Sequence, residues 1–372
     1  MREYNRVYAQ IDTQALKKNI YEIKRRTGCA RVMQVIKADA YGHGAIPVAN
    51  TLDSLVDYFA VAVIEEAVEL RKNGIVKPIL ILGLIAPQFY GDALTNNVTI
   101  TVFRYEMAEK LSVAAKSRGL VGKIHIAVDT GMSRIGFNLS DESIETIKKI
   151  YALPNINVEG IFTHFATADE GRNEFSDIQL ERFRTFCDRL EAEGVKIPVR
   201  HICNSAGIIE YDDAFMDMVR PGIISYGLYP SDAVKRDNLA LTPALAFKTH
   251  IVHTKTLPKG VGISYNHTFV TERETVVATI PVGYADGYPR SLSNRGRVLI
   301  HGQYAKILGN ICMDQFMVDV TGIDGISIDD DVTLIGTDGG NTITAEEVAG
   351  LAGTINYEII CGIGKRVPRV YI

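Results

Sequence analysis

One lysine, Lys37, stands where a buried strand meets a polar turn. The residues before it, VMQVI, are mostly apolar and rich in β-branched side chains, which indicates a strand buried on both faces. Burial disfavours the ammonium form, and a neutral amine can act as a nucleophile or form a Schiff base with a carbonyl cofactor. Tyr41 and His43 follow in a turn that contains two glycines. The alternative is that Lys37 simply extends into water, as lysines at strand ends usually do.

Other polar side chains that could share a site with Lys37 lie at the ends of later apolar runs. If these runs are parallel strands of a barrel, their carboxyl ends meet at one mouth and the side chains there converge. The candidates are Asp129 and Arg134 after the run at 123–129, His164 at the end of 158–164, Asn204 and Ser205 after 199–204, and Arg220 with Gly222 in 217–227.

Two of these segments have the composition of a phosphate site. NSAG at residues 204–207 offers a hydroxyl and free backbone N–H groups, and RPGI at residues 220–223 allows close backbone approach. Both lie where barrels commonly bind a phosphate. The alternative is that NSAG only caps the helix that follows it.

A lysine amine, a phosphate site and the guanidinium of Arg220 in one barrel mouth together indicate pyridoxal phosphate as the cofactor. Arginine stays charged at working pH and only donates hydrogen bonds, so at the pyridine nitrogen it would leave that nitrogen unprotonated. The ring would then be a weaker electron sink, which favours return of a proton to Cα, and hence racemisation over transamination. The alternative role for Arg220 is an ion pair with a barrel carboxylate.

Tyrosines in the last third of the chain are a second group of candidates. Tyr265 lies in GISYNHTF, Tyr284 in GYADGYPR and Met313 in NICMDQFMVDV. A phenol acts as a base only where nearby cations lower its pKa from about 10; Arg134, Arg220 and a protonated His164 could do so. The alternative is that these tyrosines pack in the interior with their hydroxyls hydrogen-bonded.

The pattern of strands and helices predicts how these residues are positioned. Helical runs at residues 65–74, 105–119, 141–153 and 176–194 alternate with the strands, and several end at a glycine. Eight strands over about 230 residues are typical of a (β/α)₈ TIM-like barrel. A doubly wound open sheet is the competing fold, but it usually has fewer strands and a glycine-rich first turn. The eight predicted strands are residues 32–37, 59–64, 78–83, 98–103, 123–129, 158–164, 199–204 and 217–227.

After about residue 238 the pattern changes to β-branched, alternating runs separated by Gly, Pro, Asn and Asp. This predicts a mostly β domain with one helix at residues 344–353. We therefore expect an α/β protein with a cofactor-binding barrel at residues 1–238 and a β domain at residues 239–372. The first strand, residues 7–11, is a candidate to pack on the β domain.

The composition limits the classes of function. With 372 residues, 47% of them hydrophobic, the chain is long enough for two domains and a large core. A formal charge of −4 argues against a dedicated nucleic-acid binder and leaves small polar substrates as the default. The five cysteines have no CxxC spacing and no regular framework, so neither a zinc site nor a disulfide scaffold is predicted. The histidines have no metal-ligand spacing either, so we expect no metal site. We expect a cytoplasmic protein without a membrane span, because no apolar run approaches roughly 20 residues.

The chain resembles the bacterial alanine racemases, which join a pyridoxal phosphate barrel to a β domain. The resemblance runs from end to end, and an ordered set of motifs is more specific than any one of them. The motifs are IKADAYGHG, VDTGMSRIG, THFATAD, NSAG, VRPGI, SYNHTF, GYADGY, NICMDQ and INYEIICGIGKRVPRVY.

The resemblance implies a role for each candidate residue. Lys37 holds pyridoxal 5'-phosphate as a Schiff base and is the base on one face of the substrate Cα, and Tyr265, supplied by the partner subunit, is the base on the other. Arg220 contacts the ring nitrogen, and His164 links Tyr265 to Arg220. The phosphate is held by Tyr41, Ser205, Gly222, Ile223 and Tyr357, with Asn204 in the same cofactor-binding set; Arg134 and the backbone of Met313 bind the substrate carboxylate, and Tyr284 belongs to the substrate site.

The resemblance also implies a head-to-tail homodimer with shared active sites that supplies D-alanine for peptidoglycan. The amino acid displaces Lys37, one base removes the Cα proton, and the other returns a proton to the opposite face.

One position departs from the family. Many members have a carbamylated lysine two residues before the aspartate of DTGM, where its negative charge orients the arginine that binds the carboxylate. Here that position is Ala127. We expect a substitute anion such as chloride to hold Arg134.

Three alternatives share parts of this pattern. A serine racemase of the same family would have a smaller polar residue at Tyr357, so the tyrosine favours alanine. A decarboxylase of basic amino acids shares both domains but needs an acidic end for a long side chain. A pyridoxal phosphate carrier resembles the barrel alone, and the β domain with Tyr265 argues against it.

Overall fold

The computed structural model describes residues 6–372, and these form two units. The barrel unit comprises Ala15–Ala40 and Ala45–Thr242. The β unit comprises the described chain up to Gln14, the short segment Tyr41–Gly44, and Pro243–Ile372. The chain therefore leaves the barrel unit for four residues directly after the Lys37 turn. The domain boundary predicted after residue 238 stays a prediction.

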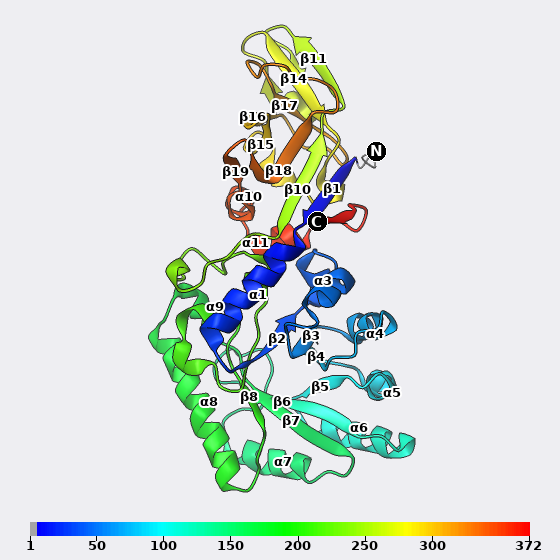
Figure 1. Ribbon diagram of the computed structural model, residues 1–372, viewed down its shortest axis with the longest axis vertical. Coiled ribbons are helices and arrows are strands. Elements are labelled where there is room, and N and C mark those ends of the chain that lie inside the picture. The colour runs from blue at the N-terminus through cyan, green and yellow to red at the C-terminus, as the bar shows by residue number, and fades with distance from the viewer. Residues whose placement is uncertain (1–5) are drawn as a thin grey trace. The chain divides into compact units, whose positions relative to one another are not determined.

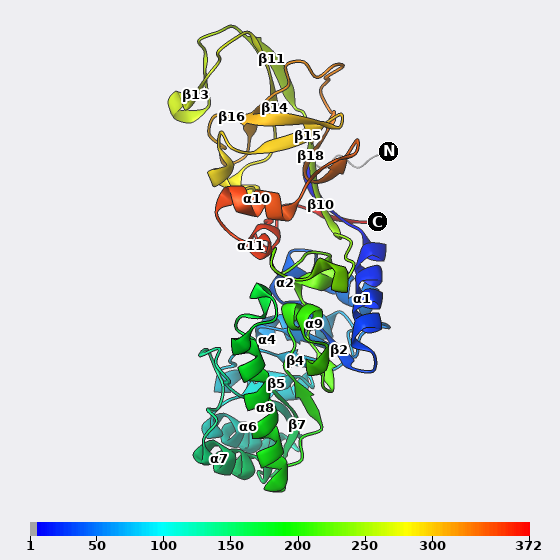
Figure 2. The same ribbon diagram turned by 90° about the vertical axis from the view of Figure 1, so that its left-hand side faces the viewer.

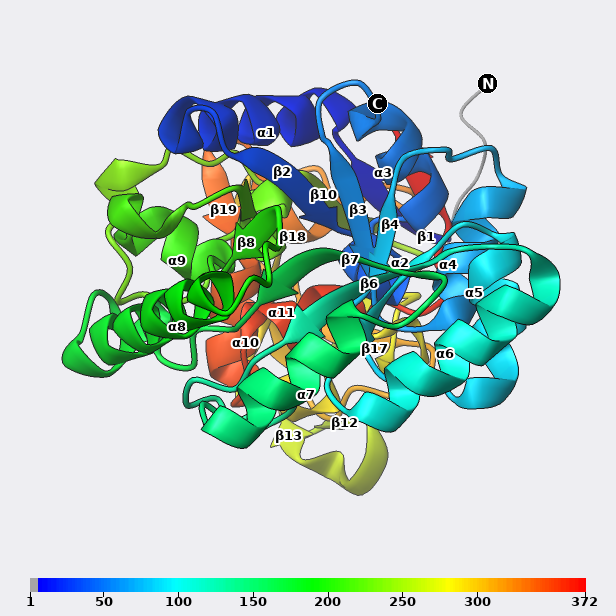
Figure 3. The ribbon, with the colours of Figure 1, turned by 90° about the horizontal axis from the view of Figure 1, so that it is seen from below.

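Eight parallel strands form the core of the barrel unit, in the order β8-β7-β6-β5-β4-β3-β2-β9 (Figure 3). Backbone hydrogen bonds from Arg220 N to Cys203 O (3.0 Å) and from Asp217 N to Arg200 O (3.2 Å) join the segments of β9 and β8. The predicted TIM-like barrel is confirmed, and the doubly wound alternative is wrong because these bonds join β9 to β8 at the other end of the strand order and close the sheet. The strands are β2 (Arg31–Val35), β3 (Tyr58–Val61), β4 (Ile79–Ile81), β5 (Thr99–Val102), β6 (Gly122–Ala127), β7 (Ile156–Phe162), β8 (Val199–His201) and β9 (Met218–Val219).

Helices surround these strands, and their ends follow local sequence signals (Figures 1 and 3). Ser140 caps α7 by accepting a hydrogen bond from Ser143 N, and α6 ends at Gly119 in the left-handed region. No helix in residues 6–372 is long and apolar enough to cross a membrane. The helices are α1 (Thr13–Thr27), α2 (Lys37–Tyr41), α3 (Ala45–Leu52), α4 (Ile64–Lys72), α5 (Tyr90–Thr95), α6 (Tyr105–Arg118), α7 (Asp141–Tyr151), α8 (Glu174–Ala192) and α9 (Ser205–Glu210).

The β unit is built on one long sheet of mostly antiparallel strands (Figure 2). The predicted mostly β architecture is confirmed, and β1 pairs with β10 and β20 in this sheet. The predicted helix near residue 344 is present as α10 (Ala345–Ala352), and α11 (Asn356–Cys361) follows it. The strands are β1 (Val7–Ile11), β10 (Leu245–His250), β11 (His253–Leu257), β12 (Gly262–Ile263), β13 (Phe269–Val270), β14 (Thr275–Ile280), β15 (Arg297–Ile300), β16 (Gln303–Leu308), β17 (Phe316–Asp319), β18 (Asp331–Asp338), β19 (Asn341–Ile343) and β20 (Arg369–Tyr371).

The segment Tyr41–Gly44 is bound to the β unit through its backbone. The carbonyl of Gly42 accepts a hydrogen bond from Arg369 Nε (2.9 Å), and the carbonyl of His43 accepts one from the Tyr371 hydroxyl (3.0 Å). Gly42 has φ +80°, and a Cβ there would lie 2.2 Å from the carbonyl oxygen of Ile360. Both the backbone conformation and the available space therefore require glycine.

We predict that Gly42→Ala destabilises the protein by about 3 kcal/mol or more, because it combines an unfavourable φ with a collision against rigid backbone. Gly28→Ala is the matched control: Gly28 also has positive φ (+60°), but a Cβ there has nothing within 4 Å, so its cost is about 1–2 kcal/mol. Scanning calorimetry of the two variants measures the difference. Equal losses of stability would contradict the role of the Ile360 carbonyl.

Candidate active site

Lys37 is half-buried and begins a turn of left-handed helix. Ala38, Asp39, Ala40 and Tyr41 have φ between 52° and 54°, a conformation that costs an L-residue roughly 1–2 kcal/mol. Four such residues in succession are strained, and strain of this kind persists only where surrounding contacts hold it, commonly at functional sites. The sequence predicted a polar turn here but not its left-handed form. The lowered pKa expected for Lys37 stays a prediction.

Arg220 lies buried just after β9, with 3% of its surface exposed. Its Nη2 donates to the carbonyls of Thr163 (2.8 Å) and Ile202 (3.0 Å), and its Nη1 lies 2.7 Å from His201 Nδ1. No carboxylate of residues 6–372 lies within ion-pair distance of it, so the alternative of a barrel ion pair is wrong. Burial lowers the pKa of Arg220 to about 10, which still leaves the guanidinium charged at neutral pH.

A chain of two buried histidines continues from Arg220 into the barrel. His201 Nε2 lies 2.9 Å from His125 Nδ1, and both rings are fully buried. A guanidinium can only donate, so His201 accepts at Nδ1, carries its hydrogen on Nε2 and donates to His125. Burial lowers the pKa of His125 to about 3, and burial and the charge of Arg220 lower that of His201 well below 6.5. Both rings are therefore neutral, and each has a fixed tautomer.

His164 is neutral as well, which corrects the expectation that it is protonated. Its Nδ1 lies 3.2 Å from Arg220 Nη2. Burial, followed by the charges of Arg220, Arg134 and Lys37, lowers the pKa of His164 well below 6.5. Because their charges act on His164, the side chains of Arg220, Arg134 and Lys37 lie in its neighbourhood, while their assembly into one site stays a prediction. Because Nδ1 accepts from Arg220, the ring hydrogen lies on Nε2.

The NSAG segment forms the expected helix cap. Asn204 Oδ1 accepts a hydrogen bond from Gly207 N (2.9 Å), so the capping interpretation is confirmed for Asn204. Ser205 is buried, and its Oγ accepts from Gly222 N (2.9 Å), which leaves the hydroxyl hydrogen for another acceptor. Ile223 is fully buried at the start of the following turn. The structure thus joins NSAG to RPGI through one hydrogen bond, while their binding of a phosphate stays a prediction.

Arg134 is exposed in the loop that follows β6. This loop is built around Asp129, whose Oδ1 accepts from Gly131 N (2.9 Å) and Ser133 N (3.0 Å). The Asp129 carboxylate is therefore bound to backbone N–H groups of the loop. No carboxylate of residues 6–372 forms an ion pair with Arg134. Ala127 is buried at the end of β6 and supplies no charge.

The β unit presents a second group of candidates on one surface. Tyr265 is 69% exposed and Met313 is 53% exposed, so the packing interpretation is wrong for Tyr265. Both line a hollow of about 630 Å³, together with Ser264, Asn266, His267, Cys312, Asp314, Gln315 and Met317. Tyr284 N donates to Cys312 O (3.2 Å), and Ala285 N donates to Met313 O (3.1 Å). These bonds join the turn of Tyr284 to the turn of Met313.

Tyr41 and Tyr357 meet within the β unit. Their ring centroids are 6.1 Å apart at an interplanar angle of 48°. Tyr41 is buried, and this burial raises the pKa of its phenol above its usual value. The Tyr41 hydroxyl is therefore a hydrogen-bond donor and not an anion at neutral pH.

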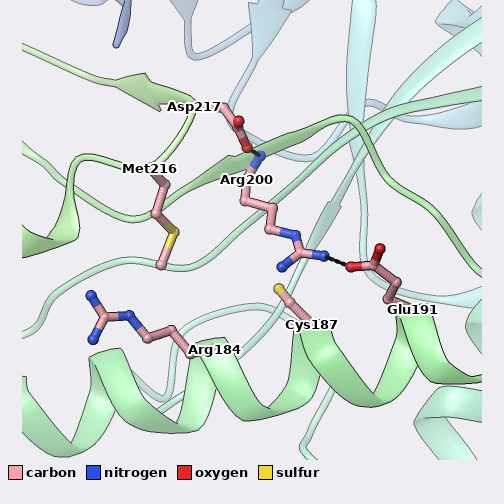
Figure 4. A pocket seen from close by; sticks show the side chains of 6 residues that line it. All are labelled: Arg184, Cys187, Glu191, Arg200, Met216 and Asp217. Atoms are coloured by element: carbon pink, nitrogen blue, oxygen red, sulfur yellow. Dashed lines mark hydrogen bonds and ion pairs between the residues drawn. The ribbon is translucent and has the colours of Figure 1, made fainter. Parts of the chain in front are cut away.

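A separate cavity of about 410 Å³ lies at the amino-terminal ends of β8 and β9, beside α8 (Figure 4). Arg200 donates to Glu191 (2.6 Å) across it, and Asp217 accepts from Arg200 N (2.8 Å). Burial raises the pKa of the Cys187 thiol to about 12, so this thiol is unreactive. None of the predicted site residues lines this cavity, and this end of a barrel usually serves stability.

These features of the barrel and the β unit define a class of two-domain barrel enzyme. Its members have a closed parallel barrel, with a lysine, a buried arginine and histidines at the strand ends, followed by a β unit. Two family models match the chain: "Alanine racemase, N-terminal domain" over residues 11–230 and "Alanine racemase, C-terminal domain" over residues 244–371. The chain belongs to the alanine racemase family, a family of isomerases.

Individual relatives agree over the whole length. An alanine racemase of Desulforamulus reducens is 47% identical over 368 residues, which is 98% of this chain and 99% of that protein. The structure of an alanine racemase of Clostridium difficile 630 is 43% identical with a TM-score of 0.96, covering 100% of this chain and 97% of that one. An alanine racemase of Bacillus anthracis with bound L-Ala-P is 37% identical with a TM-score of 0.93, covering 100% and 96%.

Sequence reasoning missed the two buried histidines, His125 and His201. Each is a polar residue at a buried position of an apolar strand, IHIAV or VRHIC. That placement was the available signal, because a buried imidazole needs a hydrogen-bond partner.

We predict that His125 contributes to acid denaturation. The unfolded chain binds a proton at His125 below about pH 6.5, whereas the folded protein does so only near pH 3, so falling pH favours unfolding by about 1.4 kcal/mol per pH unit. His125→Asn should make stability less dependent on pH between 6 and 5, as measured by urea unfolding. His253→Asn changes an exposed histidine and is the control. An unchanged slope in His125→Asn would rule out this contribution.

Proposed function

We propose that this chain interconverts L- and D-alanine with pyridoxal 5'-phosphate as cofactor, and that it supplies D-alanine for peptidoglycan in the cytoplasm. The observation that carries the proposal is Arg220, a buried guanidinium held by neutral groups alone. A buried charge without an acidic partner is costly and persists where function requires it. Its Nη atoms make all of its described side-chain hydrogen bonds, which leaves Nε–H for a ligand.

The residues present fit pyridoxal phosphate. Lys37 supplies the amine for the covalent link, and Arg220 supplies a permanent donor for the pyridine nitrogen. Ser205 has a hydroxyl hydrogen to give to a phosphate oxygen, and the protonated phenol of Tyr41 is a second donor. We assign Gly222, Ile223, Tyr357 and Asn204 to the same cofactor-binding set.

When bound, pyridoxal phosphate would supply the electron sink that makes the Cα proton of the substrate acidic. Lys37 Nζ removes or returns that proton on one face, and Tyr265 Oη of the partner subunit does so on the other. Two bases on opposite faces are needed because a single base would return the proton to the face from which it came. Arg220 would donate to the ring nitrogen and leave it unprotonated, which would limit delocalisation and favour return of the proton to Cα.

His164 acts as a neutral donor beside the tyrosine and not as a cation. Its Nε2 lies 3.4 Å from Asn204 Nδ2. With the hydrogen on Nε2 both groups are donors, so they cannot form a hydrogen bond with each other and Nε2–H is left for another acceptor. A phenolate oxygen is an acceptor that would pair well with Nε2–H. The positive charge beside the phenol then comes from Arg220 and Arg134.

The working unit is a homodimer in which each site is completed by the other subunit. Tyr265 and Met313 are exposed on one face of the β unit, as side chains that insert into a neighbouring subunit would be. Met313 N–H donates no hydrogen bond to another described residue, so it can donate to the substrate carboxylate. Tyr284 lies on the adjoining turn and borders the substrate.

Arg134 binds the substrate carboxylate together with that N–H. Its guanidinium has no acidic partner in the described chain, and Ala127 carries no charge. We propose that a small anion such as chloride takes the place of the missing carboxylate and orients Arg134.

We predict that the purified protein with added cofactor converts L-alanine to D-alanine, and L-serine less well. Lys37→Ala should lose both activity and the covalent cofactor adduct, whereas Tyr265→Ala should lose activity and keep the adduct. Mixing the two inactive variants should restore about a quarter of the activity, because half of the dimers are hybrids with one intact site each. Absorbance and a D-alanine assay measure these outcomes. If mixing restores nothing although hybrids form, the shared site is wrong.

We also predict that racemisation depends on chloride. Replacing chloride by gluconate at constant ionic strength should raise KM for alanine with a smaller effect on kcat, because Arg134 acts in carboxylate binding. Ala127→Lys, which can restore a carbamate, should remove this dependence. Equal KM values in both salts would exclude the substitute anion.

A further inference from the structure

Glu66 forms a carboxylate bridge between two segments of the barrel unit. Its Oε1 accepts a hydrogen bond from Ala38 N (2.6 Å), the first residue after Lys37. Its Oε2 accepts from Ala62 N (2.8 Å) and Val63 N (3.4 Å), at the junction of β3 and α4. The hydrogen bond to Ala62 is part-buried and those to Ala38 and Val63 are exposed, and all three have a charged acceptor, which strengthens a hydrogen bond.

The local sequence explains one end of the bridge. The N-cap of α4 is Val63, which has no side-chain acceptor. Glu66 stands at the third helical position and reaches back to the N-cap backbone, as the glutamate of a capping box does. This end alone would be an ordinary helix cap.

The other end of the bridge reaches the strained turn. Ala38 begins the succession of left-handed residues that follows Lys37, and such a conformation is kept only by surrounding contacts. Asp39 Oδ1 holds the far end of the turn by accepting from Ala45 N (2.7 Å). Glu66 is the charged group that holds the near end, one peptide bond from the lysine.

We propose that Glu66 is a positioning residue for Lys37. By fixing Ala38 N–H it sets the direction in which the backbone leaves the lysine, and hence where Nζ lies at the barrel mouth. This inference rests on the proposed role of Lys37 as the residue that holds the cofactor. Glu66 is not itself a catalytic residue, because its contacts are to backbone N–H groups.

The test must separate positioning of Lys37 from capping of α4. Glu66→Ala removes both functions. Val63→Ser supplies a hydroxyl at the N-cap, where φ −134° and ψ 163° suit a capping residue. The double variant Val63→Ser/Glu66→Ala therefore has a cap again but no contact to Ala38. Glu65→Gln is the matched control, because Glu65 is exposed on the same helical turn.

Three measurements are made on each purified full-length variant with pyridoxal phosphate. Thermal unfolding measures the stability that the cap of α4 contributes. The rate of covalent adduct formation measures how well the Lys37 amine is positioned; the adduct is trapped by borohydride and identified by mass spectrometry. Steady-state kinetics with alanine report kcat and KM separately. If Glu66→Ala does not accumulate as folded protein, Glu66→Gln replaces it. The amide of glutamine has only one acceptor oxygen, so it can accept from Ala38 N or from the α4 cap but not from both.

We expect the double variant to regain thermal stability while adduct formation and kcat stay about tenfold or more below those of the unmodified chain, with KM little changed. Glu65→Gln should match the unmodified chain in all three measurements. Recovery of adduct formation and kcat in the double variant would overturn the proposal and leave Glu66 as a helix cap. Failure of the unmodified chain to form an adduct on Lys37 would overturn the proposed function itself, and this inference with it.

Discussion

The arrangement at the barrel mouth depends on a buried guanidinium that has no acid beside it. Arg220 is held by two carbonyls and by imidazole nitrogens of His201 and His164. A carboxylate partner would stabilise the charge better, but it would also neutralise the local field. The neutral partners hold the guanidinium in place without compensating its charge.

The same guanidinium orders the hydrogens around it. Because it can only donate, it fixes the tautomers of His201 and His164, and through His201 that of His125. One cation thereby determines which nitrogen of three rings carries a proton. His164 consequently carries its hydrogen on Nε2, beside Asn204 Nδ2, and burial together with the nearby positive charges keeps this ring neutral.

The candidates on the β unit differ from those of the barrel in their exposure. Arg220 and Ser205 are buried and bonded within the barrel unit, whereas Tyr265 and Met313 are exposed on a face of the β unit. A large exposed apolar or aromatic side chain on a well-ordered turn often marks a surface that binds something else. This contrast supports a division in which the barrel holds the cofactor and a second subunit completes the site.

The sequence by itself determined the barrel, the β unit and the strand ends on which the candidates lie, because β-branched runs, helix caps and glycines are local signals. The family motifs also assigned roles to Lys37, Arg220 and Tyr265 without coordinates, and these assignments stay predictions. Only the tertiary structure decided the left-handed turn at residues 38–41, since Ala and Tyr do not favour that conformation and distant contacts hold it. The neutral state of His164 and the chain through His201 to His125 were likewise decided by the fold, because protonation and tautomer depend on burial and on partners that come from other strands.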